Sequence, residues 1–149
     1  MKIIAILAAL SMGLAGCAQP NVGVVTAAGK SYVMLHGVDA ACVHRAALKE
    51  LADYDWRVKS ETASQIVAER VAPPWLNTAV LTVGFEPPQV RMTLTILPSG
   101  SDVKVLVDPE AIINPGSSNE RVELIRATAR MNTVFDNTAH RVGQVCKTS

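Results

Sequence analysis

Aromatic side chains are scarce in this 149-residue chain, which has two Trp, two Tyr and two Phe. A buried core must therefore consist mainly of aliphatic residues. An excess of either charge is also missing, because 14 Lys and Arg are nearly balanced by 13 Asp and Glu. Without a basic surplus, neither nucleic acid nor an anionic lipid surface is expected to attract the protein electrostatically.

The sequence motifs of common enzymes are absent as well. The chain has no nucleophile elbow, no phosphate-binding loop, no HExxH and no CxxC. We therefore expect a protein that is not an enzyme and that needs no cofactor. Also missing is an apolar run of about 20 residues, the length needed to cross a bilayer as a helix.

The first 17 residues, MKIIAILAALSMGLAGC, have the pattern of a targeting segment. Lys2 gives a short positive start, Ile3 to Leu10 are apolar, and small residues lead into Cys17. The stretch Leu14-Ala15-Gly16-Cys17 resembles the lipobox of bacterial lipoproteins. This resemblance implies transfer of diacylglycerol to the Cys17 sulfur, cleavage before Cys17, and acylation of the new amino terminus by a fatty acid such as palmitate. An ordinary secretory signal with a chance cysteine is the alternative.

The lipobox resemblance also implies a location and a domain organisation. Two or three acyl chains would anchor the protein stably. Ala18 stands where an Asp would resemble an inner-membrane retention signal, which favours the outer membrane, with the domain facing the periplasm; a surface-exposed orientation stays open. We expect a signal peptide at 1–16, a flexible tether at 17–29 and a single α+β domain at 30–149.

Two further cysteines remain once Cys17 is acylated. In an oxidising compartment Cys42 and Cys146 are expected to form a disulfide, with two separate buried thiols as the alternative. Together with His44 and His140 they have the residue types that zinc prefers. These four residues lack a paired short spacing, however, and a disulfide would use both thiolates. No metal is therefore expected.

Hydrophobic periodicity predicts the secondary structure after residue 30. A short strand at 32–36 precedes a helix that Asp39 caps, with an apolar stripe at Ala40, Val43, Ala47, Leu51 and Tyr54. Apolar and polar residues then alternate, which predicts antiparallel strands at about 56–59, 65–71, 81–86, 90–96 and 103–107. The pattern indicates a sheet with one buried face.

A second helix is predicted near the carboxyl terminus. Ser117 with Glu120 matches a capping box and would open a helix reaching about Val142. The expected fold class is α+β, with an antiparallel sheet of about five strands and two antiparallel helices packed on one face. The segment ALKELADYDW entering a sheet resembles helix-grip style domains of outer-membrane assembly lipoproteins, which implies an accessory or scaffolding role.

Two surfaces are candidates for binding a partner. Alternation places Arg57, Lys59, Arg91 and Lys104 on the sheet face away from the helices, where they would suit a carboxylate-bearing partner or strand addition. A merely solvated face is the alternative. Trp75, beside two prolines, would suit a rigid contact anchor, unless it folds back over the core.

These features favour a lipid-anchored, non-enzymatic module that binds an envelope protein. A small-ligand or lipid carrier with a groove between helices and sheet is the first alternative, and an inhibitor of an envelope-targeting enzyme, acting through the loop at 73–76, is the second. A carrier needs an apolar cavity of several hundred Å³. The closely patterned aliphatic core predicts little spare volume, which favours docking of a protein.

Overall fold

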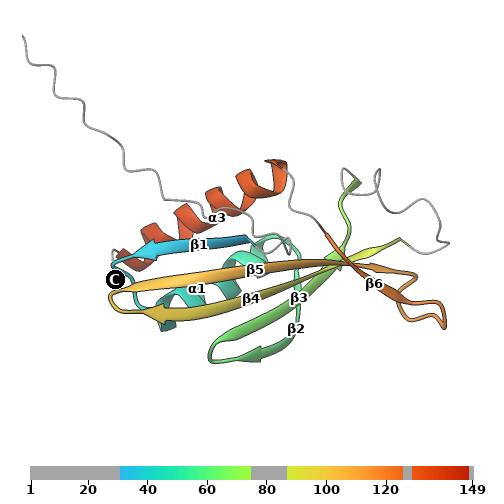
Figure 1. Cartoon of the computed structure of the whole chain (residues 1–149), viewed down its shortest axis with the longest axis horizontal. Helices are drawn as coiled ribbons and strands as arrows, with labels where there is room; N and C mark the ends of the chain where they lie inside the picture. The colour runs from blue at the N-terminus through green and yellow to red at the C-terminus, as the bar shows by residue number, and fades with distance from the viewer. Residues whose placement is uncertain (1–30, 75–86, 126–128, 148–149) are drawn as a thin grey trace, which may run out of the picture.

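The computed structural model describes residues 31–74, 87–125 and 129–147. The predicted signal peptide with Cys17, the tether, the strand at 81–86 and Trp75 all lie outside these ranges. Figure 1 shows the order of elements, which are β1 (Ser31–His36), α1 (Ala40–Asp53), β2 (Arg57–Thr62), β3 (Gln65–Val71), β4 (Gln89–Ser99), β5 (Asp102–Ile113), β6 (Arg121–Leu124) and α3 (Ala129–Lys147). Within the described ranges, no helix is long and apolar enough to cross a membrane.

The strands form one antiparallel sheet, which confirms the α+β class. Its order is β1-β5-β4-β3-β2, and β6 also pairs with β5. The described sheet therefore has six strands, where about five were predicted. Because β5 is long, it pairs with β1 through its first half and with β6 through its last four residues. Figure 1 shows β6 at the end of the sheet opposite the turn between β4 and β5.

The predicted alternation holds in the central strands. Buried and partly buried residues alternate along β4, with Val90, Met92, Leu94 and Ile96 in the core. The edge strand β2 differs, because all its residues are exposed, including Val58 at 42%. A register shift at Val58 breaks its alternation against β3, and such irregularities are common at sheet edges.

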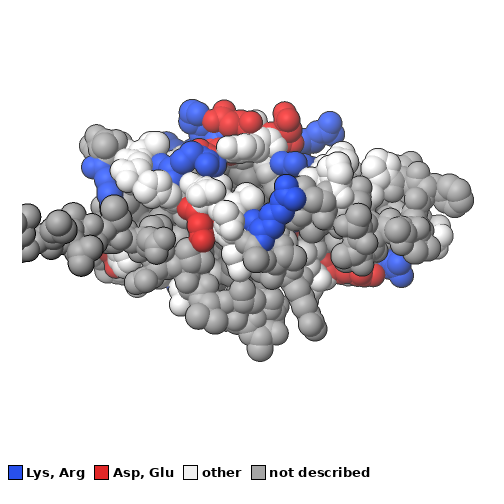
Figure 2. All heavy atoms as spheres, turned by 90° about the horizontal axis from the view of Figure 1, so that it is seen from above, with Lys and Arg blue, Asp and Glu red and all other residues white. Residues whose placement is uncertain are grey.

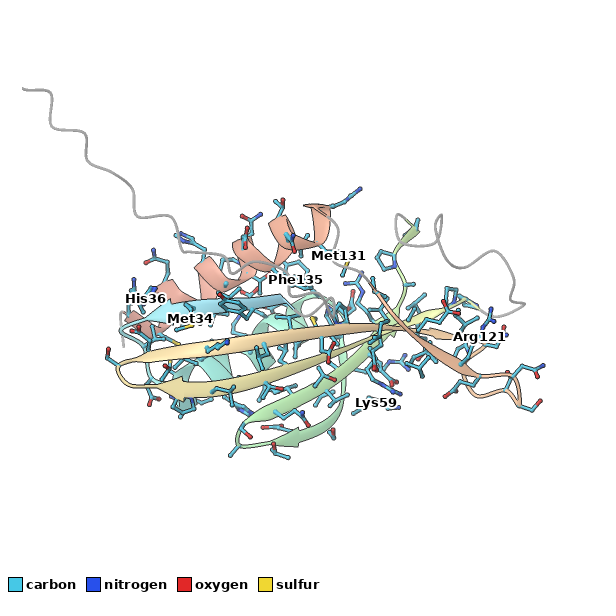
Figure 3. All side chains as sticks on the ribbon, in the orientation of Figure 1. Met34, His36, Lys59, Arg121, Met131 and Phe135 are labelled. Atoms are coloured by element: carbon cyan, nitrogen blue, oxygen red, sulfur yellow. A yellow bond between two sulfur atoms is a disulfide. The ribbon has the colours of Figure 1, made fainter. Side chains whose placement is uncertain are left out.

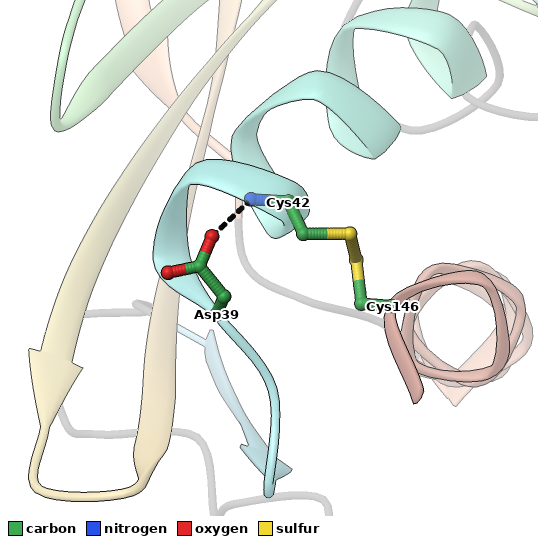
Figure 4. The surroundings of a disulfide bond; sticks show 3 residues. All are labelled: Asp39, Cys42 and Cys146. Carbon is green, nitrogen blue, oxygen red and sulfur yellow. Dashed lines mark hydrogen bonds between the residues drawn. A yellow bond between two sulfur atoms is a disulfide. The ribbon is translucent and has the colours of Figure 1, made fainter. Parts of the chain in front are cut away.

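The two helices are joined covalently. Asp39 caps α1 as predicted, and its carboxylate accepts a hydrogen bond from the Cys42 backbone N–H at 2.9 Å. Cys42 and Cys146 form the predicted disulfide, with their Cα atoms 5.7 Å apart (Figure 4). Besides α3, α1 contacts β2 and β4, and α3 contacts β1.

The predicted helix from Ser117 to Val142 is wrong in its first part. Residues 121–124 form strand β6, and α3 begins only at Ala129 and ends at Lys147. The capping-box residues close a turn instead, because the Glu120 carboxylate accepts from the Gly116 N–H and the Ser117 hydroxyl donates to the Asn114 carbonyl. Pairing of the next four residues with β5 then satisfies those of their backbone groups that face β5.

Candidate ligand-binding cavity

A cavity of about 460 Å³ lies between α1, α3 and the sheet. Its wall is mostly apolar and is built by every described element except β2 and β6. Figure 3 shows Met131 and Phe135 pointing from α3 toward the sheet. Representative lining residues are Leu35, Ala47, Leu94, Val107, Met131 and Phe135. The expectation of little spare volume was therefore wrong.

The cavity lies where two parts of the core meet. The main cluster joins β1, α1, β3, β4, β5 and the end of α3. A smaller cluster consists of Ala72, Val90, Ala111, Ile125 and Met131. Trp56 and Phe135 pack against both clusters, and residues of both line the cavity. The predicted aliphatic core is thus present, but it is divided.

A polar clasp joins the helices at the cavity. Arg141 donates from Nη2 to Glu50 Oε2 at 2.7 Å and from Nε to both carboxylate oxygens, at 3.1 and 3.2 Å. The Thr138 hydroxyl accepts a further hydrogen bond, and the guanidinium lies 5.5 Å from the centre of the Tyr54 ring. The hydrogen bond and charge of Glu50 raise the pKa of Arg141. The charge of Arg141 is therefore matched within the protein.

Arg70 is a cation on the core-facing side of the sheet. It is in register with buried Val90 and lies on the same face of β3 as Ile66 and Ala68, whose side chains are fully buried. Its Nη1 donates to the Tyr54 carbonyl at 3.1 Å, and its guanidinium lies 5.4 Å from the Trp56 ring centre. No carboxylate in the described part of the chain forms an ion pair with Arg70, which lines the cavity.

Sequence reasoning missed Arg70 although a signal was present. Residues 65–71 were predicted as a strand, and its two-residue period places residue 70 on the same face as Ile66 and Ala68. A charge at a core-facing position is unusual and is a reason to suspect a function.

The cations predicted to bind a partner lie on the other face of the sheet. Arg91 contacts Glu69 through Nη2 at 2.7 Å and through Nε at 2.8 Å, and Lys59 Nζ lies 3.5 Å from the same carboxylate. Arg57 is in register with Glu69. The structure therefore brings Arg57, Lys59 and Arg91 together around Glu69, which is only 8% exposed.

Lys104 lies apart from this group. It is on β5, where its Nζ stands 4.4 Å from the centre of the Tyr32 ring on β1. This contact is a cation–π interaction within the usual 6 Å limit. Lys104 and Arg91 are thus engaged by different neighbours and do not form one basic patch.

On the face seen in Figure 2, the described charged groups form no concentrated surface of one sign. Figure 2 views the molecule from above and shows basic and acidic side chains interspersed on that face. His44 is engaged with the Thr62 carbonyl at 2.9 Å. The described ranges contain no cluster of three or more residues suited to hold a metal ion.

Comparison with known proteins adds no family. No protein-family model matches the chain, and a search of curated proteins finds none that is significantly similar.

Proposed function

We propose that this protein is a lipid-anchored, non-enzymatic envelope protein that binds a small apolar ligand. The observation that supports this proposal is the cavity of about 460 Å³, a volume within the range of about 300–1,000 Å³ typical of ligand pockets. In the proposed arrangement the two antiparallel helices cover the same face of the sheet and hold the cavity beneath them.

The expected anchor fits this role. A lipobox at Leu14–Cys17 would attach the domain to the outer membrane on its periplasmic side. Apolar molecules are poorly soluble in water, so a carrier gains from standing next to the membrane that contains them. A binding role also agrees with the expectation that the protein is not an enzyme.

Docking of an envelope protein is the second candidate. It is favoured by a row of residues in register across four strands on the face of Glu69, which is apolar on β3, β5 and β6 and has Gln89 on β4. In this row Val71 is 58% exposed and Val122 is 46% exposed, and neighbouring Leu124 is 66% exposed. The cations first expected to attract a partner support docking less, because Lys59 and Arg91 already contact Glu69.

The cavity is tested with a neutral fluorescent probe, N-phenyl-1-naphthylamine. The full chain carries Cys17→Ser, so that no acyl chain is attached. We expect saturable binding of one probe per protein. Ala47→Phe places a ring in the cavity and should abolish this binding. Ala52→Phe makes the same change at an exposed position of α1 and should leave it intact.

Stability of the same variants gives an independent check. A phenyl ring that fills open space should keep or raise the free energy of unfolding, whereas a ring forced into a packed core lowers it by about 1–3 kcal/mol. Absence of probe binding by the wild-type chain, or a loss of that size in Ala47→Phe, would show that no usable cavity exists.

A further inference from the structure

The cavity has a mostly apolar wall, and Arg70 in this wall has no ionic partner among the described residues. Arg141 is neutralised by Glu50, so it serves the contact between the helices. Arg70 has no such partner in the described chain, and its described hydrogen bond uses one of the five N–H donors of a guanidinium. Its stacking on Trp56 holds the group in place at the cavity wall.

Arg70 is only partly exposed, and a charge that is drawn out of water is normally neutralised by a partner. The side chains beside it on this face, Ile66, Ala68 and Val90, are buried and apolar. An anionic group on a ligand would supply the missing partner. Guanidinium groups bind carboxylates and phosphates particularly well, because their donors match two oxygens at once.

The volume limits the apolar part of the ligand. At roughly 30 Å³ for each water-sized group, the space holds about fifteen such groups, and a methylene group is of similar size. One acyl chain of medium to long length fits this space. Two chains of the same length do not.

We propose that the cavity binds a single-chain anionic amphiphile, with the acyl chain between α1, α3 and the sheet and the anionic head group on Arg70. This inference rests on the proposed function and adds the chemical class of the ligand. A free fatty acid and a lysophospholipid share this chemistry, one with a carboxylate and the other with a phosphodiester.

The test measures displacement of N-phenyl-1-naphthylamine from the full Cys17→Ser chain at pH 8. Laurate and dodecan-1-ol have the same chain and differ in charge. We expect laurate to bind about tenfold more tightly, the effect of one charge-assisted hydrogen bond. Arg70→Gln should remove this preference and change the affinity for the alcohol by less than about twofold. Arg45→Gln removes the same charge from an exposed position of α1 and should change neither affinity.

The outcomes separate the two proposals. Equal affinities for laurate and the alcohol, or equal weakening of both by Arg70→Gln, would overturn the role of Arg70 while probe binding still supported the cavity. Without probe binding, both proposals fail. Tighter binding of lauroyl-lysophosphatidylglycerol than of laurate supports the proposal and indicates a lipid source, and the reverse order indicates a free fatty acid. Tighter binding of dilauroyl-phosphatidylglycerol than of either would overturn the single-chain assignment.

Discussion

Removing the disulfide is the sharpest test of how this fold is held together. Cys42 and Cys146 are 104 residues apart in the sequence, and the segment between them contains nearly all described elements. In the chain-entropy account, a bond that closes so long a loop restricts mainly the unfolded chain. The free energy of unfolding should therefore fall by about 4.7 kcal/mol when the bond is removed.

This loss is large relative to the total stability of a small domain, about 5–15 kcal/mol. Replacement of both cysteines by alanine also removes some packing, because Cys146 is buried in the main cluster. Reduction of the wild-type chain breaks the bond without deleting either sulfur. It therefore isolates the contribution of the cross-link from that of packing.

The measurement is a urea titration of oxidised wild type, reduced wild type and the double variant Cys42→Ala/Cys146→Ala, followed by circular dichroism. We expect both forms without the bond to unfold at much lower urea concentration, and the dependence on urea to steepen because their unfolded chains expose more surface. A loss below about 1 kcal/mol in both forms, far under the chain-entropy value, would refute the reasoning.

Two further predictions concern charged groups of α3. Burial raises the pKa of Asp136, whose Oδ1 has no hydrogen-bond partner in the described chain. A raised pKa in the folded state means that stability falls as the pH rises above about 4, the unfolded value. Asp136→Asn should therefore be more stable than wild type at pH 7 but not at pH 3, as thermal unfolding at both values will show; an unchanged melting temperature at pH 7 would contradict this. The Glu50–Arg141 clasp is tested by a double-mutant cycle of Glu50→Gln and Arg141→Gln, with unfolding followed in urea. We expect a coupling energy of about 0.5–1 kcal/mol. A value near zero would mean that the ion pair adds nothing to the stability of the fold.

Local patterns predicted the parts of the fold that depend on neighbouring residues. The alternation at Val90–Ile96 follows from the two-residue period of a strand, and the Asp39 cap follows from a side chain that reaches the next free N–H groups. The disulfide followed from counting the thiols of a chain expected to reach an oxidising compartment. Each of these inferences needs only the sequence close by or a count of residues.

The errors arose where distant segments decide the structure. Ser117 and Glu120 suit a helix start and a turn equally well. Because residues 121–124 pair with β5, the segment forms a turn followed by a strand. The cavity depends on the distance at which the helices are held from the sheet, which no local period encodes. Arg70 could have been recognised from its strand face, but that no described carboxylate pairs with it is visible only in three dimensions.

The disulfide and the Glu50–Arg141 clasp, which link the two helices, also bear on the stability of the cavity. At about 24 cal/mol per Å³, a void of about 460 Å³ would cost about 11 kcal/mol if it were enclosed and dry, as much as the whole stability of many small domains. The cavity is partly open to solvent, so its cost is lower than this limit. The helices would lower this cost by collapsing onto the sheet. The disulfide at one end of the helix pair and the Glu50–Arg141 clasp farther along both fix the spacing between the two helices. If the cavity serves a ligand, breaking the disulfide should weaken ligand binding as well as folding, because the same cross-link that restricts the unfolded chain also fixes the two helices that line the cavity relative to each other.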